Sequence, residues 1–141
     1  MNMKHKTEDK KEIETKKEAK KILIVDDEAS LGNVLATALS YEGYTTLKAT
    51  DGEAGLALAE KELPDLIILD IMMPKVDGIT MLKRMRENEA TKKIKVIVMT
   101  ALDDMGKIAE VLESGGDEYI VKSKIELDGI IAKVKLRLGD G

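Results

Sequence analysis

Short runs of Ile, Val and Leu alternate with helical patterns along most of this chain of 141 residues. Four runs are strongly apolar and of strand length: Lys21–Val25, Leu66–Leu69, Ile94–Met99 and Tyr119–Val121. A fifth, Tyr44 to Lys48, is more polar. Apolar runs of this length that are separated by helices are typical of buried parallel strands. The sequence therefore predicts one parallel sheet, with the polar run at an edge.

The intervening segments carry apolar residues at helical spacing. The first helix should end near Gly43, Asp51 should cap the second, and Pro64 should stop it after about Glu62. In the first helix the expected apolar positions are Leu31, Val34, Leu35, Ala38 and Leu39, and in the third they are Ile79, Leu82 and Met85. In the fourth helix they are Met105, Ile108, Val111 and Leu112, and in the last helix Leu127, Ile130, Ile131, Val134 and Leu138.

Two residues near the end of the chain, Ser123 and Glu126, have the spacing of a capping box and are expected to open the last helix.

Five strand-then-helix units predict an α/β fold. We expect a doubly wound, five-stranded parallel sheet in the flavodoxin-like order 2-1-3-4-5, with helices on both faces.

Composition limits the function classes. The chain has no cysteine, which excludes disulfides and thiolate chemistry, and no apolar run long enough to span a membrane. A cytoplasmic location is the simplest expectation.

Residues 1–20 are rich in Lys and Glu, contain His5, and are expected to form a disordered tail, leaving residues 21–141 as one domain. The acidic remainder argues against general nucleic-acid binding.

Charged and polar side chains follow the predicted strands. Asp26 and Asp27 come after Lys21–Val25, Asp70 comes after Leu66–Leu69, Thr100 closes Ile94–Met99, and Lys122 follows Tyr119–Val121. Parallel strands bring their carboxyl ends to one edge of the sheet, which is where such sheets bind ligands. Clustered carboxylates need a cation, and a nearby lysine suits an anion. The pattern therefore predicts magnesium and phosphate chemistry.

Each member of this set is weak evidence alone. An isolated Asp-Asp pair is most simply an N-cap of the following helix, and many strands end in an aspartate such as Asp70. Together, Asp27, Asp70, a backbone carbonyl and water would form the oxygen site that Mg²⁺ requires. Lys122, Thr100 and the Ala101 N–H would bind phosphoryl oxygens, leaving Asp70 as the nucleophile. A flavin site is disfavoured because three consecutive acids would repel its phosphate.

These motifs resemble the receiver domain of bacterial two-component response regulators, in particular stand-alone, chemotaxis-regulator-like receivers. The matching stretches are Ile24-Val25-Asp26-Asp27-Glu28, Asp70 to Gly78, Val98-Met99-Thr100-Ala101 and Gly115 to Lys122. The resemblance extends over about Lys21 to Leu138, nearly everything except the N-terminal tail.

The resemblance implies a role for each matching residue. Asp26 and Asp27 would form the acidic pair at Mg²⁺, Asp70 the phosphoacceptor, and Met72 the backbone-carbonyl ligand of the metal. Thr100 would be the switch hydroxyl, Lys122 the phosphate-binding lysine and Tyr119 the switch aromatic.

Two positions depart from the family pattern. Ser123 stands where a proline usually follows the lysine, which puts the reach of Lys122 in question. Met72, two residues after the phosphoacceptor, would place an apolar side chain over the site and slow self-dephosphorylation.

The function expected is that of a single-domain response regulator and not of a separate enzyme. It would accept a phosphoryl group on Asp70 from a histidine kinase or phosphotransfer protein and catalyse only its own phosphorylation and dephosphorylation. The output would be a protein target, bound by the face formed by the Met105–Leu112 helix, the strand before Lys122 and the last helix. Few residues follow Lys122, so no DNA-binding helix-turn-helix is expected.

Two alternatives stay open. One is a receiver-like interaction module that is never phosphorylated. The other is a small aspartate-nucleophile phosphatase, which would need an acid where Met72 stands.

Overall fold

The computed structural model describes residues 19–73, 76–101 and 105–140. The expected disordered tail, apart from residues 19 and 20, lies outside the described residues. In chain order the elements are β1 (Lys21–Val25), α2 (Ala29–Tyr41), β2 (Thr45–Ala49), α3 (Gly52–Glu62), β3 (Leu66–Leu69), α4 (Gly78–Glu87), β4 (Lys95–Thr100), α5 (Met105–Glu113), β5 (Glu118–Val121), the 3₁₀ turn η1 (Lys122–Lys124) and α6 (Leu127–Leu138). Five strand-then-helix units are therefore present, as the alternation of patterns predicts.

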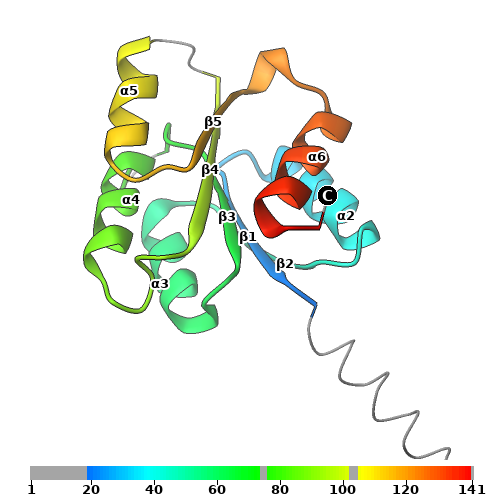
Figure 1. The fold of residues 1–141 in the computed structure, drawn as a ribbon, viewed down its shortest axis with the longest axis horizontal. Helices are drawn as coiled ribbons and strands as arrows, with labels where there is room; N and C mark the ends of the chain where they lie inside the picture. Colours follow the sequence, from blue (N-terminus) through cyan, green and yellow to red (C-terminus); the bar gives the residue numbers. More distant parts are fainter. Residues whose placement is uncertain (1–18, 74–75, 102–104, 141) are drawn as a thin grey trace, which may run out of the picture.

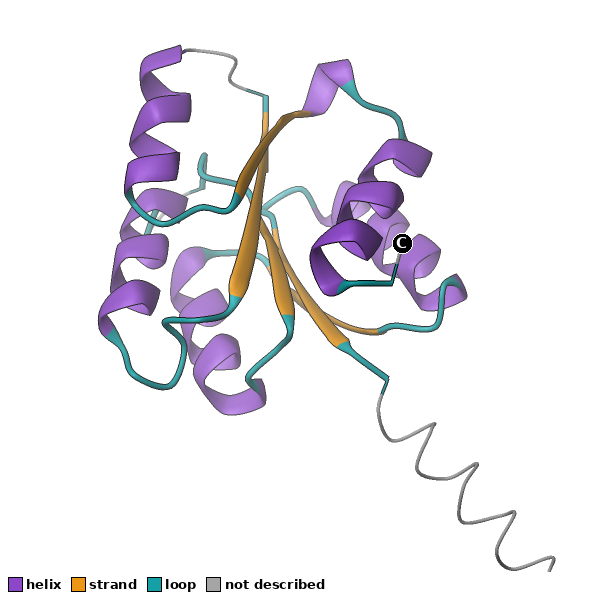
Figure 2. Ribbon diagram, viewed as in Figure 1, coloured by secondary structure: helices purple, strands orange, loops and turns teal. Residues whose placement is uncertain are grey.

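The five strands form one parallel sheet in the order β2-β1-β3-β4-β5, which confirms the predicted topology. The polar strand β2 lies at an edge, as expected. Figures 1 and 2 show α2 and α6 on one face of the sheet and α3, α4 and α5 on the other. This arrangement brings the ends of β1, β3, β4 and β5 together at the carboxyl edge of the sheet.

Alternate residues of the strands supply two separate cores. On the α2 and α6 face, side chains such as Ile24, Ile68 and Leu35 are buried; on the other face, Val25, Leu69 and Met81 are buried. Because both faces are covered, the central strands are apolar at nearly every position. This is why they appear in the sequence as continuous runs and not as an alternating pattern.

The helix ends follow the predicted signals in part. The Asp51 carboxylate accepts the Ala54 N–H at 2.8 Å, so this cap is confirmed, and α3 ends at Glu62 before Pro64. Among the described glycines, Gly43 has φ +97°, the left-handed conformation expected just past the end of α2.

The predicted capping box of the last helix is wrong. Ser123 lies inside η1, Ile125 is extended, and α6 begins at Leu127 with Glu126 as an N-cap that makes no side-chain bond. The 3₁₀ turn places Ser123 one turn too early to cap the helix.

The buried face of the first helix, α2, also differs from the predicted one. Val34 is 51% exposed because the buried face of α2 centres on Leu35, Ala36 and Leu39.

Arg86, near the end of α4, connects this helix to two neighbouring segments. Its guanidinium donates to the carbonyl oxygens of Lys92 (3.0 Å), Ile94 (2.7 Å) and Gly115 (2.7 and 3.0 Å). It also pairs with Asp117 at 3.3 Å, and the same Asp117 oxygen accepts the Val96 N–H. One partly buried side chain thus satisfies several carbonyls in the loops that lead into β4 and β5.

None of the helices in the described part of the chain is long and apolar enough to cross a lipid bilayer.

Candidate phosphoacceptor site

The strand ends position four of the predicted site residues at one edge of the sheet. Asp26 and Asp70 are the first residues after β1 and β3, and their N–H groups donate to the carbonyls of Ala49 (3.0 Å) and Val25 (2.9 Å). The parallel ladder therefore continues through both aspartates, which fixes where their side chains begin. Thr100 is the last residue of β4, and Lys122 follows β5 directly.

The ammonium of Lys122 lies among carboxylates. Its Nζ is 3.0 Å from Asp70 Oδ2, 3.2 Å from Asp26 Oδ2 and 3.0 Å from Glu28 Oε1. The described residues contain no cis peptide bond, so the Lys122–Ser123 bond is trans. With serine at the position after it, Lys122 reaches both buried aspartates.

The two buried aspartates differ from Asp27 in their surroundings. Asp26 Oδ1 accepts the Glu28 N–H at 2.8 Å, and Asp70 Oδ1 accepts the Met72 N–H at 3.0 Å, whereas Asp27 is exposed. Burial raises the pKa of Asp26 above its ordinary value, and the Glu28 N–H and Lys122 offset only part of this rise. Neither Asp26 nor Asp27 serves as the N-cap of α2, a position that Glu28 occupies.

Burial by itself lowers the pKa of Lys122. The hydrogen bonds with Glu28 and Asp70 and the charges of Asp70 and Asp26 outweigh burial, so that this pKa lies above its ordinary value. Lys122 is therefore a fixed positive charge at neutral pH. It suits an anion-binding role better than that of a general base.

Asp26, Asp27 and Asp70 can each offer one oxygen within 4.8 Å of the others. Carboxylate oxygens are the hard ligands that Mg²⁺ prefers, and the exposed Asp27 leaves the cluster open to water. The donor set therefore fits a divalent cation that keeps part of its water shell.

Thr100 carries a polar atom that has no hydrogen-bond partner among the described residues. Its side chain is fully buried, and its Oγ1 has no hydrogen-bond partner within the part of the chain that the structure describes. A buried hydroxyl left unpaired costs stability, and native proteins rarely keep one. The hydroxyl at the carboxyl end of β4 is therefore available to a ligand. The adjacent Ala101, whose N–H is predicted to bind the same group, is exposed.

Replacing Thr100 with Val is expected to stabilise the metal-free protein by about 1 kcal/mol, because Val keeps the shape and removes the unpaired hydroxyl. Thr91 offers a matched control, since it is equally buried but its Oγ1 donates to the Met85 carbonyl at 2.8 Å. Thr91→Val should cost about 1 kcal/mol. Urea unfolding of both variants measures the contrast, and equal destabilisation would contradict the assignment.

Tyr119 lies diagonally from Thr100 on the neighbouring strand. The register pairs Thr100 with Val121 and Val98 with Tyr119, so both side chains belong to the same face of the sheet. The Tyr119 ring is partly buried against the core that includes Val98. Tyr119 and Thr100 therefore lie on one face of two neighbouring strands.

Met72, two residues after Asp70, has a largely solvent-exposed side chain. Its side chain is 52% exposed, although its N–H is held by Asp70. It borders a hollow of about 410 Å³ beside Thr80 and Lys107. Pro74 and Lys75 of the same loop lie outside the described residues.

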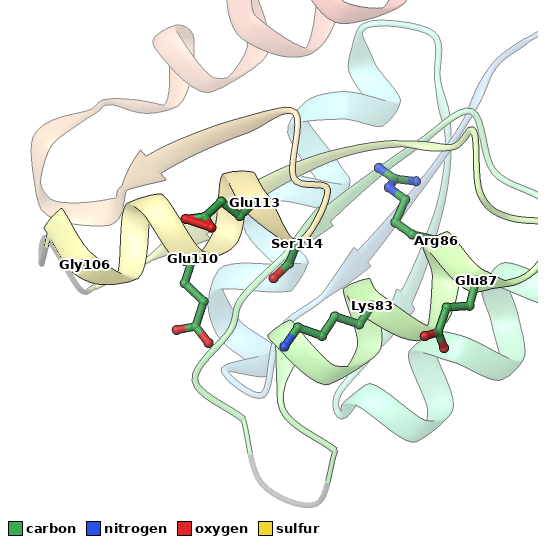
Figure 3. Close-up of a pocket in the computed structure, with 7 residues that line it drawn as sticks. All are labelled: Lys83, Arg86, Glu87, Gly106, Glu110, Glu113 and Ser114. Atoms are coloured by element: carbon green, nitrogen blue, oxygen red, sulfur yellow. The ribbon is translucent and has the colours of Figure 1, made fainter.

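A second hollow of about 490 Å³ adjoins the first between α4 and α5, and the two share Lys83 and Glu110. Figure 3 shows its lining, which is mostly charged: Lys83, Arg86, Glu87, Gly106, Glu110, Glu113 and Ser114. None of the three clustered aspartates lines it. The groove therefore lies beside the candidate site and is not part of it.

Sequence reasoning missed the contribution of Glu28, which it treated only as a further negative charge. The contact of Glu28 with Lys122 joins residues 94 positions apart. It depends on the path of the loop between β1 and α2. No local sequence signal marks this contact.

Comparison with known proteins agrees with this geometry. The profile of the response regulator receiver domain matches residues 22–135. The transcriptional regulator ycf27 of Guillardia theta is 44% identical over 128 residues, which cover 89% of this chain and 48% of that protein. The DNA-binding dual master transcriptional regulator RpaA of Synechocystis is 38% identical over 84% of this chain and 48% of its own length.

Among solved structures, a response regulator from Chloroflexus aurantiacus superposes with a TM-score of 0.80 at 32% identity, covering 86% of this chain and 99% of that one. The chain therefore belongs to the response regulator receiver domain family. Receiver domains of this family are the phosphoacceptors of two-component signalling, with phosphorylation on aspartate and Mg²⁺ at an acidic pocket. The chain spans about half the length of the curated relatives that it matches.

Proposed function

We propose that this receiver domain accepts a phosphoryl group on Asp70 from a phosphohistidine of a sensor histidine kinase or phosphotransfer protein, with Mg²⁺, and signals by a changed protein-binding surface. The observation that carries the proposal is the contact of Lys122 with Asp70 at the sheet edge where the buried Thr100 hydroxyl finds no partner among the described residues. A carboxylate nucleophile, a fixed cation and a free donor at one edge of the sheet are the parts that phosphoryl transfer needs.

In the transfer step, a carboxylate oxygen of Asp70 attacks the phosphorus atom. A new P–O bond forms as the P–N bond of the donor phosphohistidine breaks. The imidazole nitrogen leaves with the electron pair and takes a proton from solvent. Lys122 and the Thr100 hydroxyl would donate to the phosphoryl oxygens and stabilise the charge that spreads over them in the transition state. The Ala101 N–H would bind a further oxygen.

The metal site would use Asp26, Asp27, Asp70 and the backbone carbonyl of Met72. When bound, Mg²⁺ would neutralise charge shared by the carboxylates and the phosphoryl group. The cluster of three carboxylates supports this assignment. We assign Asp27 to direct contact with the metal and Asp26 mainly to contact through water.

Signalling would pass from Thr100 to Tyr119. A phosphoryl oxygen that draws the Thr100 hydroxyl inward opens space for the Tyr119 ring and changes the surface formed by α5, β5 and α6. Two large apolar side chains of α5, Met105 and Leu112, are exposed there, which favours a protein target.

The two alternatives are less well supported. A module that is never phosphorylated has no need of an unpaired hydroxyl beside a lysine and an aspartate. A phosphatase acting on free substrates needs a proton donor, and the apolar Met72 provides none. Autodephosphorylation is the only hydrolysis that we assign to the domain.

The proposal concerns the receiver domain, for which we keep the bounds 21–141. The acidic composition supports protein partners over direct nucleic-acid contact. The cytoplasm, where a histidine kinase exposes its phosphohistidine, is the proposed compartment.

The direct test is the intact mass of the protein after incubation with acetyl phosphate and Mg²⁺. We expect one added phosphoryl group, and we expect none in Asp70→Asn or in the presence of a metal chelator. Short time points are needed because aspartyl phosphates hydrolyse. A folded protein that gains no mass from acetyl phosphate or from a panel of phosphorylated kinases would refute the proposal and favour the constitutive module.

Replacing Met72 with Asn is expected to shorten the lifetime of the phosphoryl group several-fold, because a polar side chain at this position can orient the attacking water. The decay of phosphorylated protein after removal of acetyl phosphate measures it. Met105→Asn, at another exposed methionine, is the control. An unchanged lifetime in Met72→Asn would show that this side chain does not hinder hydrolysis.

A further inference from the structure

Glu28 follows the acidic pair and occupies the N-cap position of α2 without capping the helix. Its backbone is extended, and its side chain makes no cap bond. An N-cap side chain ordinarily accepts an N–H from the first helical turn. The Glu28 carboxylate instead lies 3.0 Å from Lys122 Nζ, so it interacts with the lysine of the candidate site and not with its own helix.

The three carboxylates around Lys122 match the number of its donors. An ammonium group has three N–H donors, and Nζ lies within 3.2 Å of Asp26, Glu28 and Asp70. Two of these contacts, with Glu28 and Asp70, are hydrogen bonds, so a phosphoryl oxygen that binds Lys122 competes with carboxylates already held by its ammonium.

Glu28 is the partner that water can replace. The side chains of Asp26 and Asp70 are 3% and 6% exposed, whereas that of Glu28 is 62% exposed. Removing the counter-charge from a buried carboxylate costs free energy, because the charge stays desolvated. An exposed carboxylate loses little, because water solvates it instead. Glu28 also adds negative charge at the site, which repels an incoming dianion.

We propose that Glu28 is a positioning residue that holds Lys122 in the unphosphorylated protein and gives up this contact when the phosphoryl group binds. The charge of Glu28 and its contact with Lys122 thereby lower the affinity of the site for small, doubly charged phosphodonors. A phosphohistidine on a docked partner also gains binding energy from contacts between the two proteins. This energy offsets the repulsion from Glu28 and the loss of its contact with Lys122. Glu28 thereby favours the protein donor over small anions. The inference rests on the proposed function, because it concerns the donor that reaches Asp70.

The test uses the full chain with Mg²⁺ and compares wild type with Glu28→Gln, which keeps the size of the side chain and removes its charge. Phosphorylation rates are measured against the concentration of acetyl phosphate, a dianion, and of phosphoramidate, which carries one net negative charge near neutral pH. We expect the half-saturating concentration of acetyl phosphate to fall roughly three- to tenfold, with the saturating rate within about twofold. The effect should be smaller for phosphoramidate and should shrink as salt is added.

A binding readout separates this effect from catalysis. Titration with beryllofluoride, a stable phosphoryl analogue, followed by amide NMR, should show tighter binding in Glu28→Gln. Glu89→Gln is the charge-matched control, because Glu89 lies in the loop between α4 and β4, at the opposite edge of the sheet, with a side chain 86% exposed.

An unchanged half-saturating concentration in Glu28→Gln, or an equal fall in Glu89→Gln, would overturn the inference while leaving the proposed function intact. If wild type takes no phosphoryl group from either small donor or from phosphorylated kinases, the proposed function fails, and this inference fails with it.

Discussion

Replacing Lys122 with Met is expected to slow phosphorylation of Asp70 by acetyl phosphate at least about 100-fold, because the variant loses the fixed positive charge that lies 3.0 Å from Asp70. The same change leaves Asp26 and Asp70 buried without a counter-charge. Breaking a fully buried ion pair costs roughly 3–5 kcal/mol, and the exposed Asp27 and Glu28 open this site to water, so we expect a loss of about 1–3 kcal/mol.

Initial phosphorylation rates from intact mass and the free energy of unfolding from urea titration measure these two effects. Lys93→Met removes the same charge from an exposed position and should leave both quantities nearly unchanged. Mg²⁺ should recover part of the lost stability by binding the carboxylates. A variant phosphorylated within about tenfold of the wild-type rate would show that Lys122 is not the phosphate-binding lysine.

Replacing Arg86 with Ala is expected to lower the free energy of unfolding by about 2–4 kcal/mol. The variant leaves the carbonyls of Ile94 and Gly115 without their donor and removes the partner of Asp117. The loops that these groups belong to lead into β4 and β5, which carry Thr100 and Lys122. Urea unfolding gives the loss directly.

Arg84→Ala is the control for Arg86, since Arg84 lies on the exposed side of the same helix. It should change stability by no more than about 0.5 kcal/mol. Equal losses in the two variants would mean that the contacts of the Arg86 guanidinium do not explain the result, and helix propensity would not explain it either, since Ala is the better helix former.

The strand runs made the sheet predictable, because a strand covered on both faces needs apolar residues at nearly every position. Right-handed crossovers between such strands leave few possible topologies, and the order 2-1-3-4-5 was among the simplest. The residues after the strands were predictable for the same reason, since the ends of parallel strands meet at one edge. Asp26, Asp70, Thr100 and Lys122 therefore followed from their positions in the chain.

Details that depend on where a helix begins were harder to predict. The spacing of Ser123 and Glu126 fits a capping box, but a 3₁₀ turn after Lys122 shifts the helix start to Leu127. Val34 satisfies the helical period yet is exposed, because the sheet contacts a face of α2 rotated by about one residue. Periodicity defines an apolar stripe but not which edge of the stripe the sheet covers.

The sequence by itself determined the fold class, the sheet order and the residues at the strand ends, because burial on both faces and chain connectivity act through local patterns of apolar residues. Only the tertiary structure decided how those residues interact. The Thr100 hydroxyl, which has no partner in the part of the chain that the structure describes, and the contact of Glu28 with Lys122 both depend on loop paths and on packing across the sheet. Hydrogen bonds and ion pairs depend on distances of a few tenths of an ångström, and such distances arise only when the distant segments pack together.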